Sequence, residues 1–187
     1  MNGRAKFSSR QGRPISVRRA VAEQIRWKRN PENKDLTDAF DVPMELLQKS
    51  LRIMDAAGVE FCNGSNDTGG YSPVMAAINE DGKPLFTFDP NGEIPIQEFL
   101  ACRRNWKNNK GPEALRYFYL GKESILENIE NFDVTRYQAT FVEKADGQNS
   151  GLLLGFSGSP MKDPEDEIPD TALNIVRICP PDCDDSI

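Results

Sequence analysis

The feature that most constrains the fold of this chain is a pair of short apolar runs separated by a polar turn. The runs are VMAAI at 74–78 and LFTF at 85–88, and the stretch between them contains Asp81 and Gly82. Apolar runs of this length are typical of β-strands, and an Asp-Gly pair supplies the positive φ that a tight hairpin turn requires. The sequence therefore predicts an antiparallel hairpin near the middle of the chain.

Helical patterns lie on both sides of this hairpin, and further strand patterns follow it. One helix is expected between Ser16 and the stop NPEN at 30–33, a second between Asp41 and Gly58, and others over about 95–107 and 113–131. Strands are expected at 137–143, 151–157 and 172–178. This order predicts an α+β fold. N-terminal helices would precede a small antiparallel sheet of about five strands, against which two or three helices pack.

The length of 187 residues suits a single domain with its own core. Four regions are distinguished by composition. They are a flexible basic arm at 1–14, a helical N-terminal region at 15–60, an α+β body at 61–160, and an acidic C-terminal part at 161–187. The last region contains a loop interrupted by prolines, the final strand and an acidic tail.

The inventory of reactive side chains argues against an enzyme. Histidine is absent, which excludes histidine-based triads and HExxH zinc sites. The four cysteines stand at 62, 102, 179 and 183, too sparse for a disulfide framework and without the spacing of a metal site. We therefore expect no catalytic residues, no metal, no cofactor and no small-molecule substrate. Sparse cysteines and the lack of a membrane-length apolar run favour a cytoplasmic protein, or one of a virion or host cytosol if the gene is viral.

Charge is strongly segregated along the chain. Residues 1–30 hold nine Lys and Arg against Glu23 alone, a net of +8, and residues 103–122 hold six against Glu113 alone, a net of +5. The remainder holds 8 basic and 27 acidic residues, a net of −19. Two positive islands on a negative body favour a protein that attracts a polyanion at chosen places. The alternative is that both islands are merely solvated charge.

The first island is an amphipathic cationic helix preceded by the arm. Its apolar side is expected to contain Val17, Ala20, Val21 and Ile25, with cations gathered on the other side. The nucleic-acid-binding residues predicted in this island are Arg13, Arg18, Arg19, Arg26, Lys28 and Arg29.

The second island, RRNWKNNKGPEALRYFY at 103–119, interleaves cations with aromatic residues. Exposed aromatic rings offer stacking faces to the bases of single strands, and cations neutralise phosphates. The predicted contact residues here are Arg103, Arg104, Trp106, Lys107, Lys110 and Arg116. The alternative is that the aromatic residues belong to the core and the cations line its outer side.

The segment LTDAFDVPMELLQKSLRIMDAAGVE at 36–60 resembles the helix-turn-helix and winged-helix DNA-binding families. Leu36 would occupy the apolar position of the first helix, and Leu47 with Met54 the inner side of the recognition helix. The resemblance implies that Gln48, Lys49 and Arg52 face a major groove. The departures are Asp41 in place of the usual turn glycine, and Met44 and Glu45 at the start of the helix. A simple core helix fits the same pattern.

These observations lead to one main hypothesis with alternatives. The chain is predicted to be a non-enzymatic nucleic-acid-binding protein, with RNA or DNA as partner and with possible homo-oligomers. The alternatives are a structural assembly subunit of the viral coat or nucleoprotein type, a helix-turn-helix-like regulator, and an acidic protein-binding inhibitor or immunity-type module.

Overall fold

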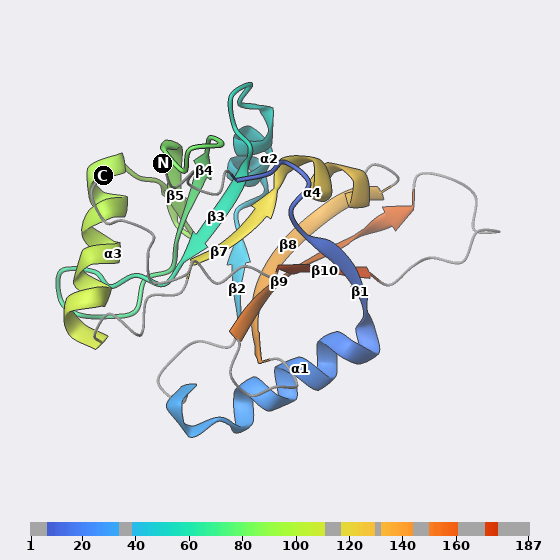
Figure 1. Ribbon diagram of the computed structural model, residues 1–187, viewed down its shortest axis with the longest axis horizontal. Helices are drawn as coiled ribbons and strands as arrows, with labels where there is room; N and C mark the ends of the chain where they lie inside the picture. The colour runs from blue at the N-terminus through green and yellow to red at the C-terminus, as the bar shows by residue number, and fades with distance from the viewer. Residues whose placement is uncertain are drawn as a thin grey trace, which may run out of the picture.

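The computed structural model describes residues 7–33, 39–110, 117–129, 132–143, 150–160 and 171–175. It confirms the α+β class: the described residues form four α-helices and ten β-strands (Figure 1). The strands make two antiparallel sheets of five strands each, where the sequence suggested about five strands in one sheet. The additional strands are three short edge strands (β1, β2 and β6), the internal strand β3, for which the sequence predicted neither a helix nor a strand, and β7, which the sequence assigned to a helix.

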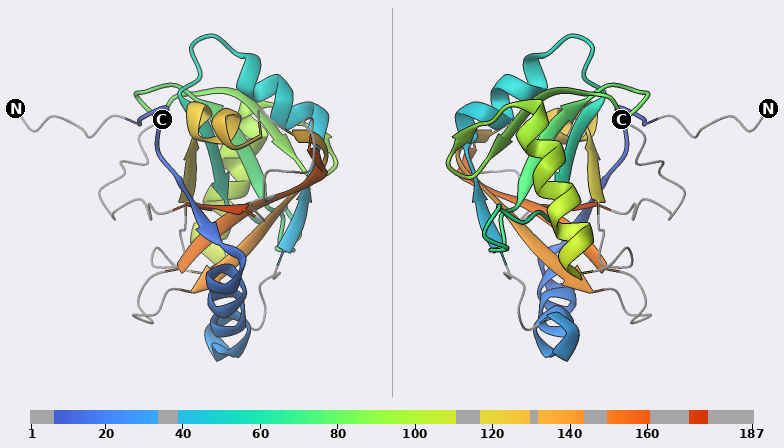
Figure 2. Two further views of the ribbon diagram at one scale, coloured as in Figure 1. Left: turned by 90° about the vertical axis from the view of Figure 1, so that its right-hand side faces the viewer. Right: turned by 90° about the vertical axis from the view of Figure 1, so that its left-hand side faces the viewer.

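The first sheet joins the two ends of the chain. Its order is β1 (Arg13–Ser16), β10 (Thr171–Ile175), β9 (Ser150–Pro160), β8 (Phe132–Glu143) and β2 (Ala39–Val42). Helix α1 (Val17–Arg29) follows directly from β1, crosses one end of this sheet and is succeeded by a 3-10 turn at Pro31–Asn33. In Figures 1 and 2, α1 stands out from the molecule below both sheets.

The second sheet contains the hairpin expected from the sequence. Its order is β6 (Gly92–Glu93), β5 (Pro84–Asp89), β4 (Val74–Ile78), β3 (Gly58–Cys62) and β7 (Tyr117–Gly121). Gly82 turns the β4–β5 hairpin at φ +82°, and the Asn79 side chain accepts hydrogen bonds from the backbone N–H groups of Asp81 and Lys83. This turn is therefore built as its residues predict.

The main core lies between the two sheets. Alternate residues of each strand point into it, for example Val59 and Phe61 of β3 against Tyr137 and Phe141 of β8. Helix α2 (Met44–Arg52) closes this core with Leu47 and Leu51, and α4 (Lys122–Ile129) with Ile125. Helix α3 (Ile96–Lys110) covers the outer face of the second sheet and makes a second core there (Figure 2).

The predicted start of one helix is wrong. The helix placed at about 113–131 begins only at Lys122, because Tyr117–Gly121 forms strand β7. Tyr117 and Tyr119 point to the α3 side while Phe118 and Leu120 point between the sheets, and all four are buried. Aromatic residues buried on both faces suit a pleated strand, and this tertiary burial outweighs the helical pattern around them.

The helix-turn-helix alternative does not agree with this architecture. Helix α2 is preceded by strand β2 and followed by strand β3, so the segment is strand–helix–strand. Lys49, expected to face a groove, instead pairs with Glu93 at 2.7 Å and lies over the ring of Phe86. Met54, expected on the inner side of that helix, lies beyond its end and is 88% exposed. The core-helix alternative fits Leu47 and Leu51.

Part of the expected flexible arm is folded onto the body. Phe7 meets Tyr119 edge-on with ring centroids 4.8 Å apart, and the carbonyls of Ser9 and Gln11 accept hydrogen bonds from the start of α4 and the end of β7. Only glycine fits at position 121, because a Cβ there would collide with the backbone of Ser9. Residues 1–6, with Arg4 and Lys6, lie outside the described residues.

Candidate nucleic-acid interface

Helix α1 is anchored to the body through one narrow face. Trp27 is fully buried there and stacks on Phe141 of β8, with ring centroids 5.2 Å apart. Glu23, also buried, accepts a hydrogen bond of 2.8 Å from Nε of Arg19 one turn earlier in the same helix. With Ala20, these residues follow the three- and four-residue spacing of one helical face.

The inward face therefore differs from the one expected from the sequence. Of the apolar side predicted for this helix, Ala20 is buried, but Val21 and Ile25 are 46% and 43% exposed. Because the indole of Trp27 buries far more apolar area than a branched aliphatic side chain, its burial decides how the helix is rotated.

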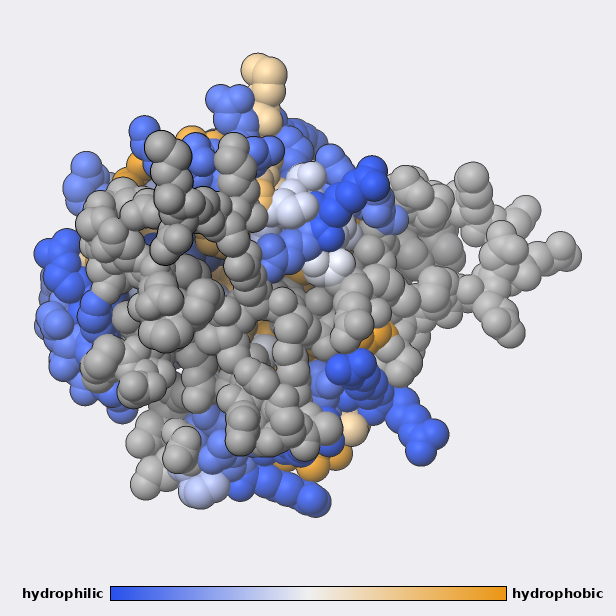
Figure 3. Space-filling model, viewed as in Figure 1, coloured by the Kyte–Doolittle hydropathy of each residue, from blue (hydrophilic) through white to orange (hydrophobic). Residues whose placement is uncertain are grey.

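The outward face of α1 combines cations with these two apolar residues. Arg18, Lys28 and Arg29 are exposed on it. Arg18, Ile25 and Arg29 stand at positions i, i+7 and i+11, which fall on one line along an α-helix. Figure 3 shows hydrophobic surface between hydrophilic side chains at this end of the molecule. We call this set of residues the α1 outward face: Arg18, Val21, Ile25, Lys28 and Arg29.

The remaining predicted cations of the first island are placed differently. Arg19 pairs with Glu23, and Nε of Arg26 donates a 3.0 Å hydrogen bond to the carbonyl of Glu143 at the end of β8. Arg13 lies in β1, where it is paired with Asn174, and its side chain is outside the described set. The first island thus contains cations committed to contacts within the protein, Arg19 and Arg26, and cations on the side of α1 that faces away from the body.

In α3 the predicted stacking aromatic belongs to the core. Trp106 is 3% exposed and meets Tyr71 edge-on at 5.5 Å between ring centroids. Tyr117, Phe118 and Tyr119 are buried as well. The prediction that Trp106 offers a stacking face is therefore wrong, and the alternative, a core aromatic, is correct. The sequence could not distinguish them, because a single aromatic beside cations fits both a core and a surface.

Arg103 is also committed to the interior. Its guanidinium lies over the rings of Tyr117, at 4.1 Å, and Phe99, at 5.3 Å, and one nitrogen is 3.7 Å from a carboxylate oxygen of Glu60. Glu60 stands in the middle of β3, buried on the side that α3 covers. It was missed by sequence reasoning, although a lone carboxylate within the apolar run GVEFC was its visible signal.

The electrostatics of this pair follow from its burial. Desolvation raises the pKa of the Glu60 carboxyl, and the positive charge of Arg103 offsets only part of that rise. Burial is the largest single influence on Arg103 and lowers its pKa, but Glu60, Cys62 and Tyr117 together outweigh it, so the net shift is upward. Burial also raises the pKa of the neighbouring Cys62 thiol well above its ordinary value, which keeps it protonated and unreactive.

The other cations of α3 remain on its outer side. Arg104 and Lys110 are exposed and Lys107 is half-buried. The ammonium of Lys110 lies 6.0 Å from the centroid of the Trp106 ring. Arg116 lies outside the described residues.

The two basic helices, α1 and α3, end on the same side of the molecule, although their first turns lie far apart (Figures 1 and 2). The last turn of α1 contains Arg26, Lys28 and Arg29, and the last turn of α3 contains Lys107 and Lys110. The structure thus brings the basic ends of both helices to one side.

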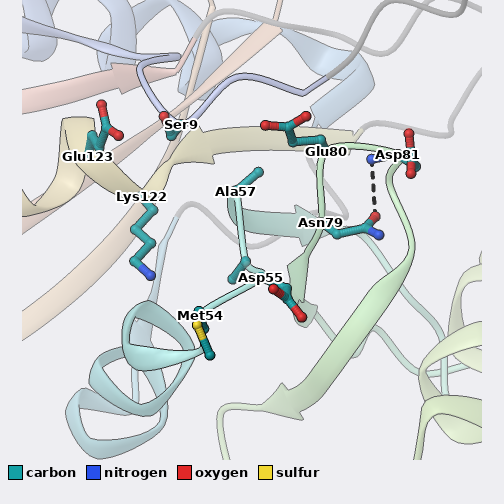
Figure 4. Close-up of a pocket in the computed structure, with 10 residues that line it drawn as sticks. Ser9, Met54, Asp55, Ala57, Asn79, Glu80, Asp81, Lys122 and Glu123 are labelled. Carbon is teal, nitrogen blue, oxygen red and sulfur yellow. Dashed lines mark hydrogen bonds between the residues drawn. The ribbon is translucent and has the colours of Figure 1, made fainter.

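Carboxylates gather at a different place. An open hollow of about 520 Å³ lies between the end of α2, the β4–β5 turn and the start of α4 (Figure 4). Asp55, Glu80, Asp81 and Glu123 line it beside one cation, Lys122, whose ammonium donates a 2.9 Å hydrogen bond to the carbonyl of Ile53. Figure 1 shows these elements at the end of the molecule opposite to α1.

Among the described residues, no helix is long and apolar enough to cross a membrane. In the same part of the chain, no three His, Cys, Asp or Glu side chains are grouped so as to hold a metal ion. The sequence matches no protein-family model, and comparison with curated proteins and with solved structures likewise gives no match.

Proposed function

We propose that this protein is a non-enzymatic nucleic-acid-binding protein whose contact surface is the α1 outward face. The observation that carries the proposal is the orientation of α1. Its carboxylate, Glu23, is buried toward the body, while Arg18, Lys28 and Arg29 are exposed at an end of the molecule away from the acidic hollow. A cationic helix on an otherwise acidic chain attracts a polyanion at that end and repels it elsewhere.

The end of α3 extends this surface. Lys107 and Lys110 lie on the same side as the last turn of α1, so a nucleic acid bound along α1 passes close to them. Phosphate neutralisation dominates the affinity of such a surface, and binding therefore weakens steeply with salt. Arg103 and Trp106 are excluded from the surface because they belong to the core.

The test is binding of the full chain to fluorescent DNA and RNA oligonucleotides, single- and double-stranded, over a salt series. The double variant R18A/R29A removes two exposed cations of the α1 outward face. A matched control, R52A/K83A, removes two exposed cations from α2 and the β4–β5 turn and changes the net charge equally. We expect R18A/R29A to lower the salt slope by about two, since each phosphate contact contributes roughly one.

The stability of R18A/R29A should stay within about 0.5 kcal/mol of the parent, because both side chains are exposed. An equal loss of binding in the two double variants would contradict a localised surface. No binding to any oligonucleotide at low salt would contradict the function itself. Light scattering on the same samples distinguishes the assembly subunit, which forms large particles when nucleic acid is added.

A further inference from the structure

We infer that the α1 outward face enters the major groove of B-form double-stranded DNA. This inference rests on the proposed function and specifies its nucleic-acid class. Three observations carry it: the burial of the aromatic rings, the dimensions of the projecting helix, and the apolar residues placed between its cations.

The aromatic rings of the described residues are poorly placed to stack on bases. Proteins that bind single strands without sequence preference stack bases on exposed aromatic rings. Among the residues whose side chains the structure describes, the large hydrophobic residues that are exposed are all aliphatic, namely Val21, Ile25, Met54, Ile96 and Leu126. Both tryptophans, Trp27 and Trp106, are buried. The other described aromatic rings are buried or only partly exposed, which disfavours a stacking platform for single strands.

The second observation concerns size. An α-helix with its side chains is about 10–12 Å across, and the B-DNA major groove is about 12 Å wide. Arg18 and Arg29 are separated by roughly 16 Å along the axis of α1, at a rise of 1.5 Å per residue. When the helix lies in the groove, two long side chains at this separation are spaced along it, one on each side of Ile25, and reach phosphates at two points of the duplex.

The third observation concerns what lies between the arginines. Ile25, 43% exposed, lies on the line between the two arginines and would reach the floor of the groove, whereas Val21, 46% exposed, lies to one side of that line. In the major groove the apolar feature of B-DNA is the C5-methyl group of thymine. A-form RNA has a deep, narrow major groove that side chains do not read, and its uracil lacks this methyl group.

An anionic membrane surface is the other polyanion that attracts cationic helices. Helices that lie in a membrane interface bury a broad apolar face rich in Trp, Phe and Leu. The inward face of α1, which contains Trp27, is already packed on Phe141. Among the described side chains of this helix, the large aliphatic ones that are exposed are Val21 and Ile25. These observations favour DNA.

The first experiment compares four probes at one salt concentration: duplex DNA, single-stranded DNA and duplex RNA of equal length, and vesicles containing phosphatidylserine. Tightest binding to duplex DNA, at least tenfold above single strands, is expected. Equal or tighter binding of single strands or duplex RNA overturns the inference but leaves the proposed function standing. Binding to vesicles alone overturns both.

The second experiment replaces every thymine of the duplex by uracil, which removes the methyl groups and keeps the phosphates. Parent protein should bind the uracil duplex about fourfold more weakly, the effect expected of one lost buried methyl contact. In I25S this discrimination should vanish. The control L126S alters an equally exposed apolar residue on α4, 41% against 43% exposed, and should retain it. Equal binding of both duplexes by the parent, or retained discrimination in I25S, overturns groove entry.

Discussion

Helices α1 and α3 have the same kind of sequence and opposite roles. Each contains several cations and one tryptophan, and in each the tryptophan is buried. They differ in where the partner carboxylate lies. In α1 it is Glu23, on the helix itself, whereas in α3 it is Glu60, on a strand below the helix. A carboxylate beneath a helix draws its arginine inward, and this contact decides which cations stay at the surface.

The comparison teaches that a count of cations does not define a binding surface. Both islands are strongly positive in sequence, but α3 uses its central arginine to balance a buried charge and to cover the rings of Phe99 and Tyr117. Helix α1 balances its buried charge one turn away on its own surface and keeps cations at both ends of its outward face.

The largest effect is expected for Trp106→Ala in α3. Removing a fully packed indole deletes its buried contacts and leaves a cavity, which costs about 3–5 kcal/mol in the free energy of unfolding. Urea denaturation followed by circular dichroism measures this. Trp106→Phe, which retains most of the apolar volume, is the control and should lose less. A stable Trp106→Ala protein with weakened binding to single strands would restore the stacking interpretation that the structure rejects.

A smaller loss, about 3 kcal/mol at neutral pH, is expected for Arg103→Ala, because Glu60 is left buried without a counter-charge. The double variant E60Q/R103M, which removes both charges, should regain much of that stability. Equal losses in the single and double variants would mean that Arg103 acts only through its packing on the tyrosine and phenylalanine rings.

The pH dependence of these variants has a definite sign. The folded pKa of Glu60 lies above its usual value of 4.5, so the folded state holds the proton more tightly. The associated stability is present below pH 4.5 and is lost as the pH rises through the folded pKa. Without Arg103 the pKa rises further, so the stability of Arg103→Ala should fall more steeply over this range than that of the parent. E60Q should abolish the difference.

Sequence reasoning predicted those parts of the fold that local chemistry determines. The prediction of the β4–β5 hairpin is confirmed because Asn79 and Gly82, both inside the turn, determine its geometry. The bounds of α1 are as predicted because its own residues favour a helix, whichever face is packed against the body. Strand β7 was missed because burial on both of its faces, by α3 and by the opposite sheet, is not encoded in its own residues.

The candidate site was predictable to the same extent. The cationic helix was found, but its rotation was not, since the rotation depends on the stacking of Trp27 against Phe141, more than a hundred residues later. The assignment of Arg103 failed for the same reason: its partner is a strand residue that only the tertiary fold brings beneath α3. Helical periodicity shows which residues share one face of a helix, but it does not show which face the rest of the protein covers.

The smallest effect is expected for the surface pair of Arg10 and Glu123. Their nitrogen–oxygen distance of 2.7 Å is shorter than the 3.7 Å of Arg103 and Glu60, but the side chains are 77% and 46% exposed. Water screens the pair and the long side chains lose freedom in forming it, so burial rather than distance ranks the two pairs. Arg10→Ala should unfold at nearly the same temperature as the parent.

The small contribution of the Arg10–Glu123 pair to stability depends on pH in the opposite direction to that of Glu60. The hydrogen bond from Arg10, helped by Ser9, lowers the pKa of Glu123 below its usual 4.5. The stability contributed is therefore present above pH 4.5 and disappears as the pH falls through the folded pKa. Thermal unfolding of parent and Arg10→Ala at pH 7 and pH 3 measures it, with any difference confined to the higher pH. A loss as large as that of Arg103→Ala would mean that the short contact outweighs burial, and the ranking of the two ion pairs would reverse.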